Sequence, residues 1–176
     1  MAQPFIPPAY TPPREVRFEA FHLEVLAARH ATPDFDAVRA SEAQIAHAFG
    51  PSNWWSAETT YASNLADLTR HEEEFERRES FAYAMLGTPG DAYLGCVYIL
   101  PIRAAWQRDQ AFGDPQARVY FWLSALQQVL DEEHAFETLR AWLAQAWPFA
   151  ACMFPGCSIP WADWQARAPE DTRPDL

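Results

Sequence analysis

Two apolar segments separated by a short turn-forming stretch constrain the fold of this chain more than any other feature of its sequence. Phe81–Leu86 and Ala92–Leu100 are β-like runs, and Gly87-Thr88-Pro89-Gly90-Asp91 stands between them. Glycine, proline and aspartate favour tight turns, so the pattern predicts an antiparallel hairpin. A third apolar run, Ala117–Ala125, predicts a further strand.

The segments around these strands have the residue pattern of helices or of one more strand. Val16–Ala28 alternates between apolar and polar residues, which predicts a strand. Helices are predicted from Pro33 to Arg39, from the capping-box pattern at Ser41 to Phe49, from Thr59 to Glu79, and from Asp131 to Trp147. The chain therefore belongs to the α/β class.

The two ends of the chain differ in composition from the part between them. Residues 1–14 contain five prolines and predict an extended arm, while residues 166–176 form a polar tail. A single domain is therefore expected over residues 15–165. Phe5, Ile6 and Tyr10 of the arm can pack either onto that domain or onto a second copy of the chain, and both alternatives stay open.

The charge of the chain bears on its partners and location. The formal net charge is −11, and all 13 basic residues are arginine. Nucleic acids and anionic membranes attract clustered cations, so we expect neither as a partner. Apolar runs such as Leu94–Pro101 are too short to span a bilayer, and the first 13 residues do not resemble a signal peptide. We expect a cytoplasmic protein; an amine substrate suits the acidic charge, although solubility alone also explains it.

The titratable residues show no metal-binding motif. The three cysteines, Cys96, Cys152 and Cys157, form no CxxC pair, and we expect Cys96 to be a buried, inert thiol. In His71-Glu72-Glu73-Glu74-Phe75 the second histidine of a metalloprotease helix is missing. We expect no metal site, and this segment predicts a solvent-exposed helix face with the pairs Glu73–Arg77 and Glu74–Arg78.

The order of these elements resembles the GNAT (GCN5-related N-acetyltransferase) superfamily. The resemblance is carried by Phe81–Leu86, by Leu94-Gly95-Cys96-Val97-Tyr98-Ile99 and by the strand Val119–Leu123, and it covers roughly Arg17 to Trp147. It implies an α+β type of fold, a mixed and mainly antiparallel sheet flanked by helices. Because few residues follow Trp147, the C-terminal half of that fold is expected to be shortened.

The phosphate-binding loop of that superfamily has no counterpart here. In GNAT enzymes a Gln/Arg-x-x-Gly-x-Gly/Ala loop follows the strand, and its backbone N–H groups hold the pyrophosphate of acetyl-CoA at a helix N-terminus. Here the stretch is Leu126–Glu133, in which Gln128 matches the leading glutamine but Asp131 and Glu133 replace the small residues. Carboxylates at this position repel a pyrophosphate. A C-terminal tyrosine acid is also missing, because no tyrosine follows Tyr120.

The resemblance nevertheless implies positions for a donor and for acid–base groups. An acyl-pantetheine arm is expected along the backbone of Leu123, Ser124 and Ala125, with Gln128 beside it. An amide N–H near Gly95–Val97 would polarise the thioester carbonyl. The candidate acids are Tyr98, Tyr120 and Ser124, and the candidate base that takes a proton from an amine is Glu24.

Two functions from different classes stay open. In the first, the protein is an N-acyltransferase that uses acetyl-CoA or another acyl-CoA to modify an unknown small-molecule amine. In the second, it is a non-catalytic GNAT-like module that binds a small molecule or a protein. Trp142, Trp147, Trp161 and Trp164 either complete the core or form an apolar patch for ligand binding or homodimerisation.

Overall fold

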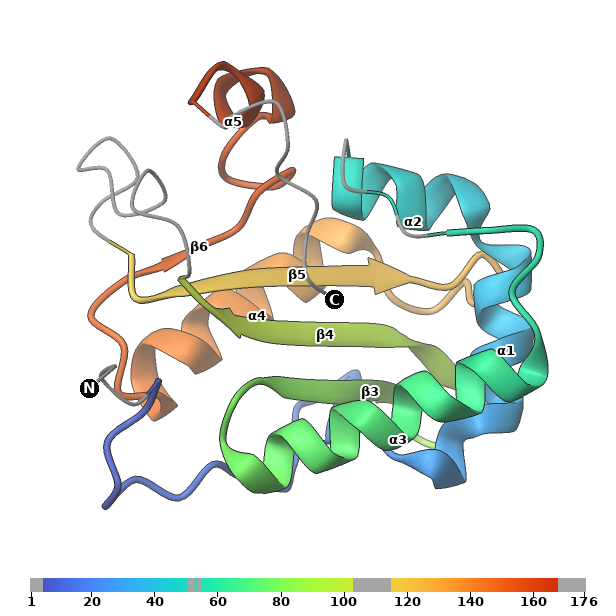
Figure 1. Cartoon of the computed structure of the whole chain (residues 1–176), viewed down its shortest axis with the longest axis horizontal. Coiled ribbons are helices and arrows are strands. Elements are labelled where there is room, and N and C mark those ends of the chain that lie inside the picture. The colour runs from blue at the N-terminus through green and yellow to red at the C-terminus, as the bar shows by residue number, and fades with distance from the viewer. Residues whose placement is uncertain (1–4, 51–52, 54, 103–114, 168–176) are drawn as a thin grey trace.

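The computed structural model describes residues 5–50, 53, 55–102 and 115–167. These residues form one sheet whose strand order follows the chain: β1 (Glu15–Arg17), β2 (Phe21–Val25), β3 (Phe81–Gly87), β4 (Tyr93–Pro101), β5 (Ala117–Leu123) and β6 (Cys152–Met153). The helices are η1 (Ala28–His30), α1 (Ala31–Ala40), α2 (Glu42–Phe49), α3 (Tyr61–Arg77), α4 (Glu132–Ala146) and α5 (Trp161–Arg167). Neighbouring strands from β1 to β5 are antiparallel, and β6 is parallel to β5 (Figure 1). The mixed, mainly antiparallel α/β sheet is confirmed.

The hairpin predicted from its turn residues lies at the centre of the sheet. β3 and β4 pair along their length, with a register shift after Met85, and β4 continues into an antiparallel pair with β5. Gly95 in β4 has a φ of 148°, and a Cβ atom there would overlap the carbonyl oxygen of Trp122. Glycine is therefore needed where these two strands approach each other.

The strand predicted within Val16–Ala28 is confirmed at Phe21–Val25, but the segment is not one continuous strand, because it folds back on itself. β1 and β2 form an antiparallel hairpin in which Arg17 lies opposite His22. The N–H of Phe18 donates to the carbonyl oxygen of Phe21 at 2.8 Å, and their rings pack with centroids 4.8 Å apart. The turn contains neither glycine nor proline, so the sequence carries no local signal for it.

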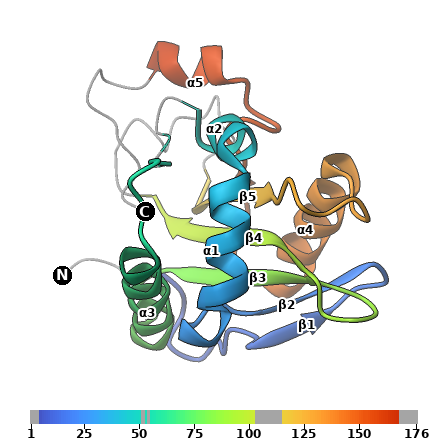
Figure 2. The ribbon, with the colours of Figure 1, turned by 90° about the vertical axis from the view of Figure 1, so that its right-hand side faces the viewer.

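Helices cover both faces of the sheet and give the domain two apolar cores. On one face α2 lies over β5 and α1 over β4, with α3 beside β3 (Figure 2). On the other face α4 buries Leu139, Trp142 and Leu143 against Tyr83 and Phe121 of the strands. Alternate strand residues enter alternate cores, as the period of a β-strand requires.

The N-terminal arm packs onto its own domain. Ile6 is fully buried in the core, and the ring of Phe5 stacks on Phe81 and Phe149. The hydroxyl of Tyr10 donates to the carbonyl oxygen of Ala146 at 2.9 Å. The described part of the arm therefore covers the domain.

The tryptophans of the C-terminal part pack in two places: Trp142 and Trp147 in the core beneath α4, and Trp164 in a small separate cluster with Ile102 and Met153. Trp142, Trp147 and Trp164 are buried, and Trp161 is half-buried against α2. The indole N–H of Trp161 donates to the backbone carbonyl of His47 at 2.9 Å, which fixes the start of α5 against α2. Residues 168–176, most of the predicted tail, lie outside the described residues. In the described part of the chain, no helix has both the length and the apolar character needed to cross a membrane.

Candidate functional site

The candidate site begins where β5 loses its neighbour. β6 pairs only with Ala117 and Arg118 of β5, and ends at Met153. Along Val119–Leu123, no strand of the described chain therefore borders this edge. The N–H of Ser124 donates to the carbonyl oxygen of Leu94 in the β4 direction at 2.7 Å. Since backbone groups alternate along a strand, those of Leu123 point the other way, toward the open edge.

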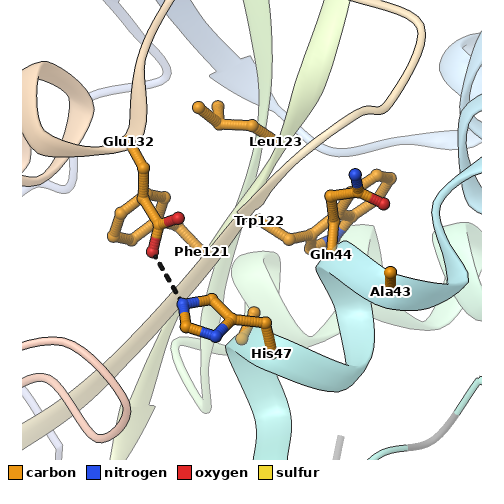
Figure 3. Close-up of a pocket in the computed structure, with 8 residues that line it drawn as sticks. Ala43, Gln44, His47, Phe121, Trp122, Leu123 and Glu132 are labelled. Carbon is orange, nitrogen blue, oxygen red and sulfur yellow. Dashed lines mark hydrogen bonds and ion pairs between the residues drawn. The ribbon is translucent and has the colours of Figure 1, made fainter.

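A cavity of about 370 Å³ lies at this end of β5. Three elements supply its lining, because β5 ends there between α2 and the start of α4 (Figure 3). Its walls consist of Ala43, Gln44, His47, Ala48, Phe121, Trp122, Leu123 and Glu132. The apolar strand side chains and the polar groups of two helices thus meet in one hollow, as small-molecule sites require.

A histidine and a glutamate face each other across this cavity. His47 comes from the last turn of α2 and Glu132 from the first turn of α4. The His47 Nε2 and Glu132 Oε1 atoms are 3.2 Å apart (Figure 3), and both side chains are more than half exposed. A carboxylate that accepts from one ring nitrogen leaves the other nitrogen to accept a proton, which is the geometry of a general base. The two residues are 85 positions apart, and no local sequence pattern connects them.

Side-chain oxygens of the protein itself occupy the backbone amides of the loop that follows β5. Ser41 Oγ accepts from the N–H of Ala125 at 3.0 Å, and Ser124 Oγ accepts from Leu126 at 3.1 Å. Gln127 Oε1 accepts from both Val129 and Leu130, at 2.9 and 3.0 Å. These four N–H groups therefore already donate to side-chain oxygens, three of them within the loop and one at Ser41.

The same contacts correct the prediction of a capping box at Ser41. The Ser41 hydroxyl makes no cap hydrogen bond to α2. It donates instead to the carbonyl oxygen of Ala37 in α1 at 2.5 Å, while it accepts from Ala125. A hydrogen bond to the end of β5 has replaced the local one. At α4, by contrast, Asp131 is a true N-cap, because its carboxylate accepts from the N–H of His134 at 2.8 Å.

Comparison with known proteins identifies the fold. No protein-family model matches the sequence, and no curated protein is detectably similar to it. Among solved structures, a ribosomal-protein-S5-alanine acetyltransferase from Vibrio fischeri superposes with a TM-score of 0.52 at 11% identity, covering 75% of this chain and 68% of the other. A Vibrio cholerae protein described as a ribosomal-protein-serine acetyltransferase gives 0.52 at 13% identity, over 74% and 64% of the two chains. A Bordetella pertussis protein described as a GNAT-family acetyltransferase gives 0.50 at 13% identity, over 75% and 70%. The chain has a GNAT-like fold.

On this GNAT-like fold the four predicted donor-binding residues lie together at the end of β5. Leu123 lines the cavity, and Ser124 is buried beside it. Ala125 and Gln128 follow in the exposed loop, with the N–H of Ala125 engaged by Ser41. Their role in donor binding stays a prediction.

The predicted acids and base lie in different surroundings. Tyr98 and Tyr120 are opposite each other on β4 and β5 and are buried beneath Phe49. Burial raises the pKa of both phenols, which makes them weaker acids. Glu24 lies on β2, which β3 and β4 separate from β5, and a hydrogen bond from Arg29 lowers its pKa, which makes it a weaker base. None of these acid–base candidates is among the residues that line the cavity, although Ser124 directly follows Leu123, which does.

The expected amide near Gly95–Val97 is not free. β4 pairs with β3 on one side and with β5 on the other across these residues. Their N–H groups therefore face neighbouring strands, and the expectation that one of them polarises a thioester carbonyl is wrong. Along Val119–Leu123, in contrast, the outer edge of β5 has no neighbouring strand in the described chain.

A second polar cluster lies between α1, α3 and β4, beside a smaller cavity of about 150 Å³. Asp34 is 2% exposed, accepts from Asn64 Nδ2 at 2.8 Å and accepts a short hydrogen bond from the Tyr93 hydroxyl. The Cys96 thiol lies 2.9 Å from the same hydroxyl. Burial raises the pKa of Asp34 and also that of Cys96, in line with the expected inert thiol.

The acidic stretch of α3 is only partly the exposed face that the sequence predicted. The Glu73–Arg77 pair is confirmed at 3.3 Å, but the Glu74–Arg78 pair is wrong. Arg78 donates instead to backbone carbonyls of the N-terminal arm, at 2.8 Å. Glu74 lies 3.6 Å from the buried His71 and accepts from Ser80 and Arg70, so its pKa falls to about 2.

Within residues 5–50, 53, 55–102 and 115–167, no three histidine, cysteine or carboxylate side chains are placed to hold a metal ion.

Proposed function

We propose that the protein transfers an acyl group from an acyl thioester, such as acetyl-CoA, to an amine. The observation that carries this proposal is the open edge of β5 beside a 370 Å³ cavity. An extended pantetheine arm contains two amide groups and can pair with such an edge as an added strand does. The backbone of Leu123 can then form hydrogen bonds with the arm close to its thioester.

The residues at the cavity can supply the proton transfers. The amine nitrogen attacks the thioester carbonyl carbon, so that a C–N bond forms and the C–S bond breaks. With its Nε2 donating to Glu132, the imidazole of His47 takes the proton from nitrogen at Nδ1 and returns it to the leaving thiolate. Edge amides of β5 can stabilise the negative charge that develops on the carbonyl oxygen.

A pair of substitutions at Leu123 tests the edge. Leu123→Pro removes an N–H that points away from β4, so the sheet keeps its hydrogen bonds while the edge loses a donor. Leu123→Ala keeps that donor and loses more of the side chain than the proline variant does, so it controls for the loss of side-chain contacts. We expect a saturating acetyl thioester to raise the melting temperature of the wild type and the alanine variant by about 5–10 °C. The proline variant should show less than half of this shift.

Thiol release in the presence of an amine panel distinguishes catalysis from binding. The transferase is supported if the amine makes the thiol leave the acetyl thioester faster than the uncatalysed reaction does. This faster release should be absent in Leu123→Pro. Equal melting shifts and equal rates of thiol release in the proline and alanine variants would contradict binding of the acyl donor at this edge, provided that circular dichroism shows both variants to be folded.

A non-catalytic ligand-binding module is the second candidate. The internally bonded amides of Ala125, Leu126, Val129 and Leu130 favour it, because the superfamily uses free amides at this point to hold its cofactor. This function predicts a melting shift with a small ligand but no thiol release with any amine.

A further inference from the structure

We infer that the site recognises its acyl thioester through the pantetheine-like arm alone and disfavours the diphosphate that CoA carries. This inference rests on the proposed function. It assigns a donor class to the cavity: acyl thioesters whose arm is uncharged at the end that emerges beside α4.

The first reason is the hydrogen bonding of the loop after β5. A diphosphate needs several free N–H donors that converge on one point. Here the amides of Ala125 and Leu126 donate to serine hydroxyls, and those of Val129 and Leu130 share Gln127 Oε1. A phosphate bound there would have to displace acceptors that are already in place, and it would gain little in exchange.

The second reason is the charge around the mouth of the cavity. The N-terminal end of α4, which attracts anions in other proteins, is capped by the Asp131 carboxylate. Glu132 follows and lines the cavity itself, and Glu133 is exposed beside it. His47 is placed to pair with only one of these three carboxylates. A diphosphate at this position therefore meets like charges.

The third reason is the apolar character of the same loop. Leu126 is 63% exposed and Val129 72% exposed, which makes them the most exposed large apolar side chains in the described chain. They stand in the stretch where the superfamily places its phosphate-binding loop. Methylene and gem-dimethyl groups of a neutral arm can bury this surface, whereas a hydrated diphosphate cannot.

The decisive experiment compares two donors that share an acyl group and an arm. Dissociation constants of the full-length protein are measured by calorimetry for acetyl-CoA and for S-acetylpantetheine, which lacks the phosphates and the nucleotide. We expect S-acetylpantetheine to bind as tightly as acetyl-CoA, within about threefold, or more tightly. Added salt should strengthen acetyl-CoA binding, because it screens the repulsion. Tighter binding of acetyl-CoA by more than threefold would overturn the inference and leave the proposed function standing.

Matched charge variants test the part played by the cavity carboxylate. Glu132→Gln should tighten the binding of acetyl-CoA by about threefold to tenfold more than it tightens the binding of S-acetylpantetheine. Glu133→Gln removes the same charge one position further on, outside the cavity lining, and should have a smaller effect. An equal gain in affinity for both donors in Glu132→Gln would contradict a repulsion between this carboxylate and the diphosphate of CoA. If neither donor binds to the wild type, the proposed function fails together with the inference.

Discussion

Two regions of the molecule combine carboxylates with other polar groups, and they are built in opposite ways: one lies between α1, α3 and β4, and the other at the end of β5 between α2 and α4. Around Asp34 the carboxylate is 2% exposed and is held by Tyr93 and Asn64. At the end of β5, the side chains of His47 and Glu132 pair with each other beside an open cavity, and both are more than half exposed. Buried groups with their hydrogen bonds made stabilise one conformation, whereas exposed groups beside a hollow remain available to a ligand.

The comparison shows why the more elaborate polar network is not the better candidate for the site. A desolvated carboxylate with raised pKa, close to a thiol and a phenol, has features often found in active sites. Each of its neighbours, however, already serves as a partner within the protein. The simpler pair at β5 stands beside unpaired backbone groups and a larger cavity, which is what a substrate needs.

The largest expected effect on stability comes from Asp34. Asp34→Ala leaves the hydroxyl of Tyr93 and the amide of Asn64 buried without their acceptor, and should lower the free energy of unfolding by about 3 kcal/mol. Asp36→Ala, on the exposed face of the same helix, should change it by less than about 0.5 kcal/mol. Urea unfolding at pH 7 measures both. Similar values for the two variants would mean that the buried network is not structural.

An intermediate effect is expected from Glu74, which is partly buried. Its pKa of about 2 in the folded protein lies below the ordinary value of 4.5, so it stabilises the protein above pH 4.5. That stabilisation is lost as the pH falls from 4.5 toward 2. The wild type should therefore lose about 2 kcal/mol more than Glu74→Gln over this range, after allowance for its partial exposure.

Thermal or urea unfolding as a function of pH tests this difference. Glu73→Gln is the matched control, because Glu73 is exposed and pairs only with Arg77 among the described ion pairs. It should follow the pH profile of the wild type. Parallel profiles for Glu74→Gln and the wild type would show that the contacts of Glu74 do not lower its pKa.

The smallest effect on stability is expected from the open pair. His47→Ala removes a side chain that is 59% exposed, so the free energy of unfolding should change by less than about 0.5 kcal/mol. Acyl transfer, in contrast, should fall by about 100-fold or more, because the general base is lost. Initial rates of amine acylation by the wild type and by His47→Ala measure this loss. A large loss of stability with an unchanged rate of acyl transfer would mean that the pair at β5 is structural and not catalytic.

Much of the fold could be predicted because its signals are local. The hairpin of β3 and β4 follows from a five-residue turn sequence between apolar runs, and α3 and α4 follow from their helical patterns. The β1–β2 hairpin was not predictable in this way, because Phe18, Glu19 and Ala20 form its turn without glycine or proline.

The candidate site depended on contacts that no local pattern encodes. The sequence by itself determined that the loop after β5 lacks glycines and carries carboxylates, since both are properties of consecutive residues. Only the tertiary structure decided that Ser41 reaches Ala125 over 84 positions and that His47 meets Glu132 over 85. Local backbone preferences act over a few residues, whereas these contacts exist because packing α2 and α4 against the sheet brings distant segments together.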